Sequence, residues 1–180
     1  MKPETKQVKH LNIEIKAHCR RPERVRQVLR EAGAVFRGTD EQTDVYFRVP
    51  KGRLKLRQGT IENALIFYER PDEAGPKRSD VFLYPAAESG LLREVLEKAL
   101  GVLAVVRKRR EIYFLKNIKF HLDSVEGLGD FAEIEVMDTE GSGDCEGLRR
   151  QCEDFMRRFG IETKDLLERS YSDMILEKGR

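Results

Sequence analysis

The chain has 180 residues, and 37% of them are charged, yet its formal net charge at pH 7 is only +2. This length suits one domain with a buried core, so we treat residues 1–180 as a single unit. The balanced charge excludes the strong positive field of a nucleic-acid binder. The longest apolar run, Val102 to Val106, is too short to cross a bilayer. The first ten residues lack the apolar segment of a signal peptide, and the three cysteines form no CxxC pair. We therefore expect a cytoplasmic protein with reduced thiols and with neither a nucleic-acid nor a membrane partner.

Alternating apolar and polar residues predict eight β-strands along the chain. The predicted strands span residues 11–18, 44–49, 53–58, 63–70, 79–84, 104–115, 117–124 and 131–137. Helical spacing of apolar residues predicts helices at 22–32, 91–100 and 144–160, and one or two short helices between 163 and 178. Residues 1–10 are expected to be a flexible N-terminus, and residues 144–180 to hold the C-terminal helices. Because short turns join most of the strands, the predicted fold is α+β: an eight-stranded antiparallel barrel with helices packed outside.

Charged residues recur two positions apart within the predicted strands. Since residues i and i+2 of a strand share a face, each such strand has one charged and one apolar face. The pairs are Glu14/Lys16, Lys55/Arg57, Arg78/Asp80, Lys108/Arg110, His121/Asp123 and Glu133/Glu135. An antiparallel sheet with its charged face in water would also produce this pattern. However, like-charged neighbours repel unless a counter-ion lies between them. We therefore favour a polar lumen that binds an ionic ligand.

The pattern identifies two sets of candidate ligands in the lumen. A hard divalent cation prefers carboxylate oxygens, and the metal candidates are Glu14, Asp123, Glu133 and Glu135. A polyanion needs several cations, for which the candidates are Lys16, Arg48, Lys55, Arg57, Arg78, Lys108 and Arg110.

Several strings, in order, resemble the CYTH superfamily, also called triphosphate tunnel metalloenzymes. The opening string Asn12-Ile13-Glu14-Ile15-Lys16 is similar to the ExExK strand of that family. The strings QTDVYF (42–47), LKLR (54–57), KRR (108–110) and GLGDFAEIE (127–135) follow, with Ser170-Tyr171 near the end. The resemblance covers residues 11 to 173 and is greatest to the class IV adenylyl cyclase-like branch.

The resemblance implies a triphosphate-binding tunnel that uses Mg²⁺ or Mn²⁺. It implies catalytic roles for Glu14, Lys16 and Arg110, and action on a small triphosphate such as ATP, thiamine triphosphate or tripolyphosphate. ATP cyclisation and triphosphate hydrolysis both fit, and a non-catalytic nucleotide- or polyphosphate-binding module is the alternative. The oligomeric state, including a homodimer, is left open.

Two positions depart from the family pattern. Asn12 stands where the signature has its first glutamate, so Asn12 would offer an amide oxygen to the metal in place of a carboxylate. Glu69 stands where the family often has a basic residue, and a regular strand is expected to point the neighbouring Arg70 to the opposite face.

Overall fold

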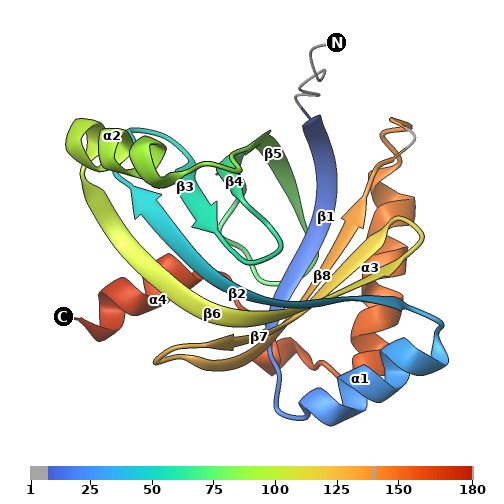
Figure 1. Cartoon of the computed structure of the whole chain (residues 1–180). Helices are drawn as coiled ribbons and strands as arrows, with labels where there is room; N and C mark the ends of the chain where they lie inside the picture. The colour runs from blue at the N-terminus through green and yellow to red at the C-terminus, as the bar shows by residue number, and fades with distance from the viewer. Residues whose placement is uncertain (1–7, 140, 180) are drawn as a thin grey trace.

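The computed structural model describes residues 8–139 and 141–179. Its strands form a closed ring in the order β1-β5-β4-β3-β2-β6-β7-β8, and every neighbouring pair is antiparallel. The strands are β1 (Val8–His18), β2 (Val35–Phe47), β3 (Arg53–Gln58), β4 (Ala64–Glu69), β5 (Lys77–Pro85), β6 (Val102–Leu115), β7 (Ile118–Val125) and β8 (Gly129–Met137). The helices are α1 (Pro22–Glu31), α2 (Gly90–Leu100), α3 (Cys145–Phe159), a 3-10 turn (Thr163–Asp165) and α4 (Tyr171–Lys178). The predicted α+β fold with an eight-stranded antiparallel barrel is confirmed (Figure 1).

The pleat of β1 shows how the ring separates its two faces. Ile13 and Ile15 are buried against the outer helices, in a core cluster that includes Leu29 of α1 and Phe155 of α3. Asn12, Glu14 and Lys16 alternate with these residues and line the interior. The charged face of this strand is therefore turned into the barrel, and the alternative of a sheet with a solvated charged face is wrong.

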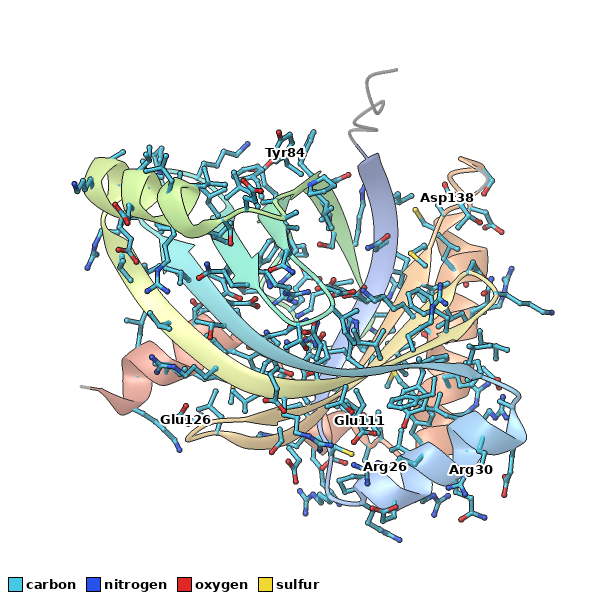
Figure 2. All side chains as sticks on the ribbon, in the orientation of Figure 1. Arg26, Arg30, Tyr84, Glu111, Glu126 and Asp138 are labelled. Atoms are coloured by element: carbon cyan, nitrogen blue, oxygen red, sulfur yellow. The ribbon has the colours of Figure 1, made fainter. Side chains whose placement is uncertain are left out.

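Helix α1 is tied to the outer face of β6 by one ion pair. Arg26 donates through Nε and Nη2 to the Glu111 carboxylate, at 2.9 and 2.8 Å. Figure 2 shows both side chains on the side of the barrel where α1 lies. Because Glu111 alternates with the inward-facing Arg110, this ion pair is outside the barrel interior.

Helices α2 and α4 cover other parts of the barrel. Leu92 and Leu96 of α2 pack on the outer residues Phe47 and Leu56. Tyr171 at the start of α4 contacts the ring of Phe131, with centroids 4.9 Å apart. The described part of the chain has no helix that is both long and apolar enough to span a membrane.

The structure differs from the predicted boundaries most clearly at β2, which begins at Val35 and not at residue 44. Residues 36–43 read FRGTDEQT, which lacks an apolar alternation, so local pattern could not identify them. Pairing with β6 extends the strand from Val35 opposite Phe114 to Phe47 opposite Val102. Tertiary pairing therefore overrides a weak local preference. Of the N-terminus expected to be flexible, residues 1–7 lie outside the described residues, while residues 8–10 belong to β1.

Candidate functional site

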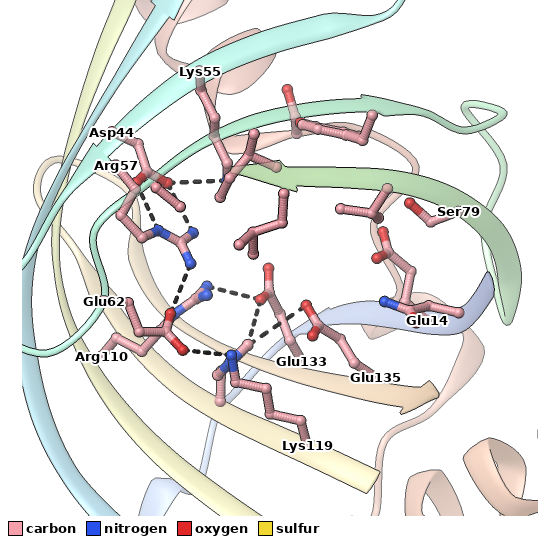
Figure 3. Close-up of a pocket in the computed structure, with 18 of the residues that line it drawn as sticks. Glu14, Asp44, Lys55, Arg57, Glu62, Ser79, Arg110, Lys119, Glu133 and Glu135 are labelled. Atoms are coloured by element: carbon pink, nitrogen blue, oxygen red, sulfur yellow. Dashed lines mark hydrogen bonds and ion pairs between the residues drawn. The ribbon is translucent and has the colours of Figure 1, made fainter. Parts of the chain in front are cut away.

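The barrel encloses a cavity of about 500 Å³. All eight strands contribute alternate side chains to its wall, and Ser170 and Tyr171 come from the start of α4. Figure 3 shows charged side chains of this wall pointing toward one another. The lining includes seven cationic side chains, Lys16, Lys55, Arg57, Arg70, Lys108, Arg110 and Lys119. It also includes five carboxylates, Glu14, Asp44, Glu62, Glu133 and Glu135. The site therefore has an excess of positive charge, as binding of a polyanion requires.

One group of cations surrounds Asp44. Arg57 donates to both carboxylate oxygens, at 2.9 and 3.1 Å, while Lys108 and Lys55 donate at 2.7 and 3.1 Å. Burial alone would raise the pKa of Asp44, but the three cations hold it well below its usual range. Three cations share one carboxylate, so Lys108 is poorly compensated: desolvation, opposed by Asp44, lowers its pKa to about 7.

A second group surrounds Glu133. Its carboxylate pairs with Lys16, accepts a hydrogen bond from Arg110 at 2.7 Å, and lies 2.9 Å from His121 Nδ1. Arg110 also donates to Asp123 at 2.6 and 2.5 Å. Burial would raise the pKa of Glu133, but Arg110 and Lys16 lower it well below its usual range. The second group thus joins β1, β6, β7 and β8 across the floor of the cavity.

An acidic region next to this group could hold a metal ion. Ligand atoms of His121, Glu133 and Glu135 all lie within 4.8 Å of one another. Glu14 of β1 lies opposite Glu135 of β8 in the register of these two antiparallel strands. Burial raises the pKa of Glu14, and the neighbouring carboxylates of Glu135 and Glu133 raise it further, against the opposing effect of Arg70. A donor set of several carboxylates and one imidazole fits a hard divalent cation.

Buried polar atoms without hydrogen-bond partners also mark the cavity. Among the described residues they include Asn12 Oδ1, Arg70 Nε, Ser79 Oγ and His121 Nε2, all on residues of the cavity wall. An unpaired buried polar atom costs about 1–3 kcal/mol, so such atoms usually have a ligand or a water molecule as partner. Their shared position supports a polar ligand in this cavity.

The wall formed by β4 and β5 is different in character. The inward residues of these two strands are mostly apolar: Ala64, Ile66, Val81, Leu83 and Pro85. Charged side chains come mainly from the other strands. The cavity can therefore contact an organic group on one side while its cations hold phosphate on the other.

Most of the predicted site residues lie together in the cavity. The structure brings together Asn12, Glu14, Lys16, Lys55, Arg57, Lys108, Arg110, Glu133 and Glu135. Asp123 is fully buried behind this wall, where its carboxylate accepts hydrogen bonds from Arg110 and from the Tyr171 hydroxyl at 2.8 Å. Both of its oxygens are engaged, so in this structure it positions Arg110, and its role as a metal ligand stays a prediction.

The expectation that Arg48 and Arg78 face the lumen is wrong. Strand β2 ends at Phe47, after a register shift against β6, so its alternation does not extend to Arg48, which is exposed. The Arg78 side chain is 59% exposed and pairs with Asp80 on the outer face. Strand β5 turns Lys77 and Ser79 inward instead. Because this segment has a cation on each face, the sequence could not show which of its alternate residues face the lumen.

The expected orientation of Glu69 and Arg70 is reversed in the structure. Glu69 lies on the outer face and pairs with Lys51 at 3.0 Å. Arg70 continues the inward series of β4 and donates to Glu14 at 2.7 Å. Thus a basic residue does reach the lumen from this segment, and the departure at Glu69 does not remove a cation from the cavity.

Sequence reasoning also missed Lys119 and Glu62. Lys119 has the same parity as His121 on β7, so the alternation of that strand was sufficient to find it. Glu62 lies in the turn between β3 and β4, where no periodicity exists. Only the fold brings Glu62 to the cavity.

With this geometry in view, comparison with known proteins gives a clear result. The CYTH domain family matches residues 10–171. The chain belongs to the CYTH domain family. Among curated proteins it is similar to the adenylate cyclase CyaB of Aeromonas hydrophila, with 40% identity over 70 residues. That alignment covers 39% of this chain and 36% of the relative, so it spans only about a third of that protein.

Two solved structures extend the similarity of this CYTH protein over nearly its whole length. A protein from Pyrococcus horikoshii OT3 is 29% identical, with a TM-score of 0.78 over 90% of this chain and 98% of that chain. A Hippeastrum protein described as having a dominant triphosphatase activity is 17% identical, with a TM-score of 0.56 over 95% and 96% of the two chains. At 17% identity the likeness shows a shared fold alone.

Proposed function

We propose that this CYTH protein is a divalent-metal-dependent enzyme that acts on an organic triphosphate. The observation that carries the proposal is one cavity with seven cationic side chains beside the acidic group of His121, Glu133 and Glu135. A triphosphate needs several cations, and its metal ion needs carboxylates. The apolar wall of β4 and β5 adds a surface for a base or another organic group, which favours such a substrate over inorganic tripolyphosphate.

The metal would be held by Glu133, Glu135 and His121, with Glu14 opposite Glu135 and the Asn12 amide on the same face of β1. Mg²⁺ or Mn²⁺ suits this donor set. When bound, such an ion neutralises phosphate charge and orients the phosphate chain. The cations that would bind the chain are those around Asp44 and Glu133, together with Arg70 and Lys119.

Two reactions fit this arrangement. In ATP cyclisation the ribose 3′-hydroxyl attacks the α-phosphorus. The bond from the α-phosphorus to the bridging oxygen breaks, and pyrophosphate leaves while the cations of the cavity stabilise its negative charge. In hydrolysis water attacks the terminal phosphorus, the bond from that phosphorus to the bridging oxygen breaks, and phosphate and the shortened chain are released. Arg110 would stabilise the developing charge in either reaction. Lys16, whose pKa burial lowers against the opposing effect of Glu133, is the candidate proton acceptor.

Cyclisation is the first candidate because of the similarity to an adenylate cyclase over 70 residues and the apolar wall suited to a base. The deciding experiment incubates the protein with ATP, thiamine triphosphate or tripolyphosphate and either Mg²⁺ or Mn²⁺, and separates the products by chromatography. Cyclic AMP with pyrophosphate identifies a cyclase, and release of phosphate identifies a hydrolase. Binding of these ligands with no product would contradict both reactions and leave the non-catalytic binding module.

A further inference from the structure

The turn between β3 and β4 is fixed by a buried carboxylate. Asp40 of β2 accepts hydrogen bonds from the backbone N–H groups of Ile61 and Glu62, at 2.9 and 3.0 Å, and from the Thr60 hydroxyl at 3.0 Å. The turn also fits closely against this carboxylate, because a Cβ on Gly59 would lie 2.6 Å from Asp40 Oδ1. The backbone of Glu62 is therefore held in one place by the fold.

From this turn, the Glu62 side chain reaches two cations on strands that are not neighbours. Arg57 of β3 donates to it at 2.9 Å, and Lys119 of β7 donates at 2.5 Å. In the ring, β2 and β6 separate these two strands. The carboxylate thus bridges the cavity from one wall to another, as Figure 3 shows. Burial alone would raise the pKa of Glu62, but Lys119 and Arg57 lower it, so the group is ionised at neutral pH.

A carboxylate between an arginine and a lysine makes the same charge-assisted contacts that a phosphoryl group would make. Arg57 already has another anionic partner, because Asp44 accepts two hydrogen bonds from its guanidinium. Glu62 is therefore a second anion on a cation that is already paired. A ligand that needs Arg57 and Lys119 must compete with it.

We propose that Glu62 is a specificity-determining residue, which holds the anion position between Arg57 and Lys119 and competes there with one phosphoryl group of a bound phosphate chain. This rests on the proposed function, because it requires that phosphate chains enter the cavity. A short chain can be held by the cations near Glu14 and Glu133. A longer chain that extends to Arg57 and Lys119 must displace Glu62. The residue therefore reduces the preference of the protein for long chains over short ones.

The test measures pyrophosphate and tripolyphosphate binding by titration calorimetry at one ionic strength, with and without Mg²⁺. The proteins are wild type, Glu62→Gln and Glu111→Gln. Glu62→Gln removes the charge at nearly constant shape, so tripolyphosphate should bind at least about tenfold more tightly, and pyrophosphate should change by less than about threefold. Glu111→Gln removes the same charge from an arginine pair outside the cavity. Both affinities should stay at the wild-type value in that control.

Each other outcome overturns the proposal. Unchanged or weaker tripolyphosphate binding in Glu62→Gln would show that Glu62 does not compete. An equal gain for both ligands, or an equal gain in Glu111→Gln, would show a general charge effect without selectivity for chain length. If neither wild type nor Glu62→Gln binds either ligand, phosphate chains alone do not enter the cavity and the proposal fails, whereas the product assay with ATP and thiamine triphosphate tests the proposed function separately. Melting curves confirm that each variant is folded, and Glu62→Ala provides a second variant without the side-chain amide.

Discussion

Lys108 illustrates how a single side chain in the cavity responds to the charges around it. It shares the Asp44 carboxylate with Lys55 and Arg57, and it is almost fully buried. Desolvation lowers its pKa to about 7 although Asp44 acts in the opposite direction. An anion that enters the cavity would favour the charged form of this lysine and raise its pKa again.

Triphosphate binding is therefore expected to take up a proton at Lys108. In the protein without ligand, the pKa of Lys108 is about 7. Above this pH the lysine is mostly neutral and must gain a proton to pair with the ligand. The affinity should fall as the pH rises from about 7 to about 9, because that proton becomes harder to obtain. Calorimetry in two buffers with different ionisation enthalpies measures the uptake. Lys108→Arg, which stays charged, should remove this contribution, and equal uptake in both proteins would contradict the assignment.

Glu135 is the best single residue with which to test the metal group. Glu133 also holds Lys16 and Arg110, so its substitution would disturb the cavity itself. In wild type, a metal that binds only the folded state should raise the free energy of unfolding by about 2.7 kcal/mol at a hundredfold excess over Kd. Glu135→Gln should remove most of that gain. Melting curves against Mg²⁺ or Mn²⁺ concentration measure the effect, and an unchanged response would exclude Glu135 as a ligand.

Asn12 offers the opposite change at the same group. Asn12→Glu adds a carboxylate two residues from Glu14 on the same face of β1, so metal should bind more tightly. Without metal, the added buried charge lacks a partner and should cost about 1–3 kcal/mol of stability. The melting temperature of this variant should therefore be lower than that of wild type without metal, and it should rise more steeply with metal concentration. The variant could instead be as stable as wild type without metal and respond to metal as wild type does. That result would contradict the placement of Asn12 at the metal site.

At the scale of an element, α4 closes the charged network from one end. The Tyr171 hydroxyl donates to Asp123, and the ring of Tyr171 lies 3.4 Å from Lys16 Nζ, measured to the ring centroid. Asp123 in turn holds Arg110 in the cavity. Helix α4 therefore positions two residues with proposed catalytic roles, Lys16 and Arg110.

Tyr171→Phe should separate these two contacts. The ring remains beside Lys16, but Asp123 loses one hydrogen bond, so the free energy of unfolding should fall by about 1 kcal/mol. Tyr171→Ala also removes a buried ring and should cost about 3–5 kcal/mol. Denaturant unfolding measures both values. Equal stabilities for wild type and Tyr171→Phe would show that the hydroxyl contributes nothing to the network.

The strands also show how much of the site the sequence could predict. A period of two was enough to identify the charged faces of β1, β3 and β8, because in each of them one face is apolar. It failed at β5, where Lys77 and Arg78 give both faces a cation and only pairing with β1 decides the parity. It gave no information on Glu62, because a turn has no period. Asp123 was placed on the correct strand, but its burial behind Arg110 depends on the packing of α4.

At the scale of the whole molecule, the site exists only because the ring is closed. Every strand contributes to the cavity wall, and the charged groups join strands that are far apart in the sequence. The β1–β8 pair brings Lys16 opposite Glu133 and Glu14 opposite Glu135. The order of strands around the ring is a property of the complete fold, so the alternation within each strand could not predict which charged pairs would meet.

The central claim is that the inward face of the barrel, and not its charged exterior, binds the triphosphate. The most direct test compares two arginines on strands of the same barrel: Arg57 in the cavity and Arg78 on the outer face. Tripolyphosphate affinity is measured by calorimetry for wild type, Arg57→Ala and Arg78→Ala in the presence of Mg²⁺. Arg57→Ala should weaken binding at least about tenfold, which corresponds to about 1.4 kcal/mol, and Arg78→Ala should leave it unchanged. Equal losses in the two variants, or no loss in Arg57→Ala, would contradict the claim.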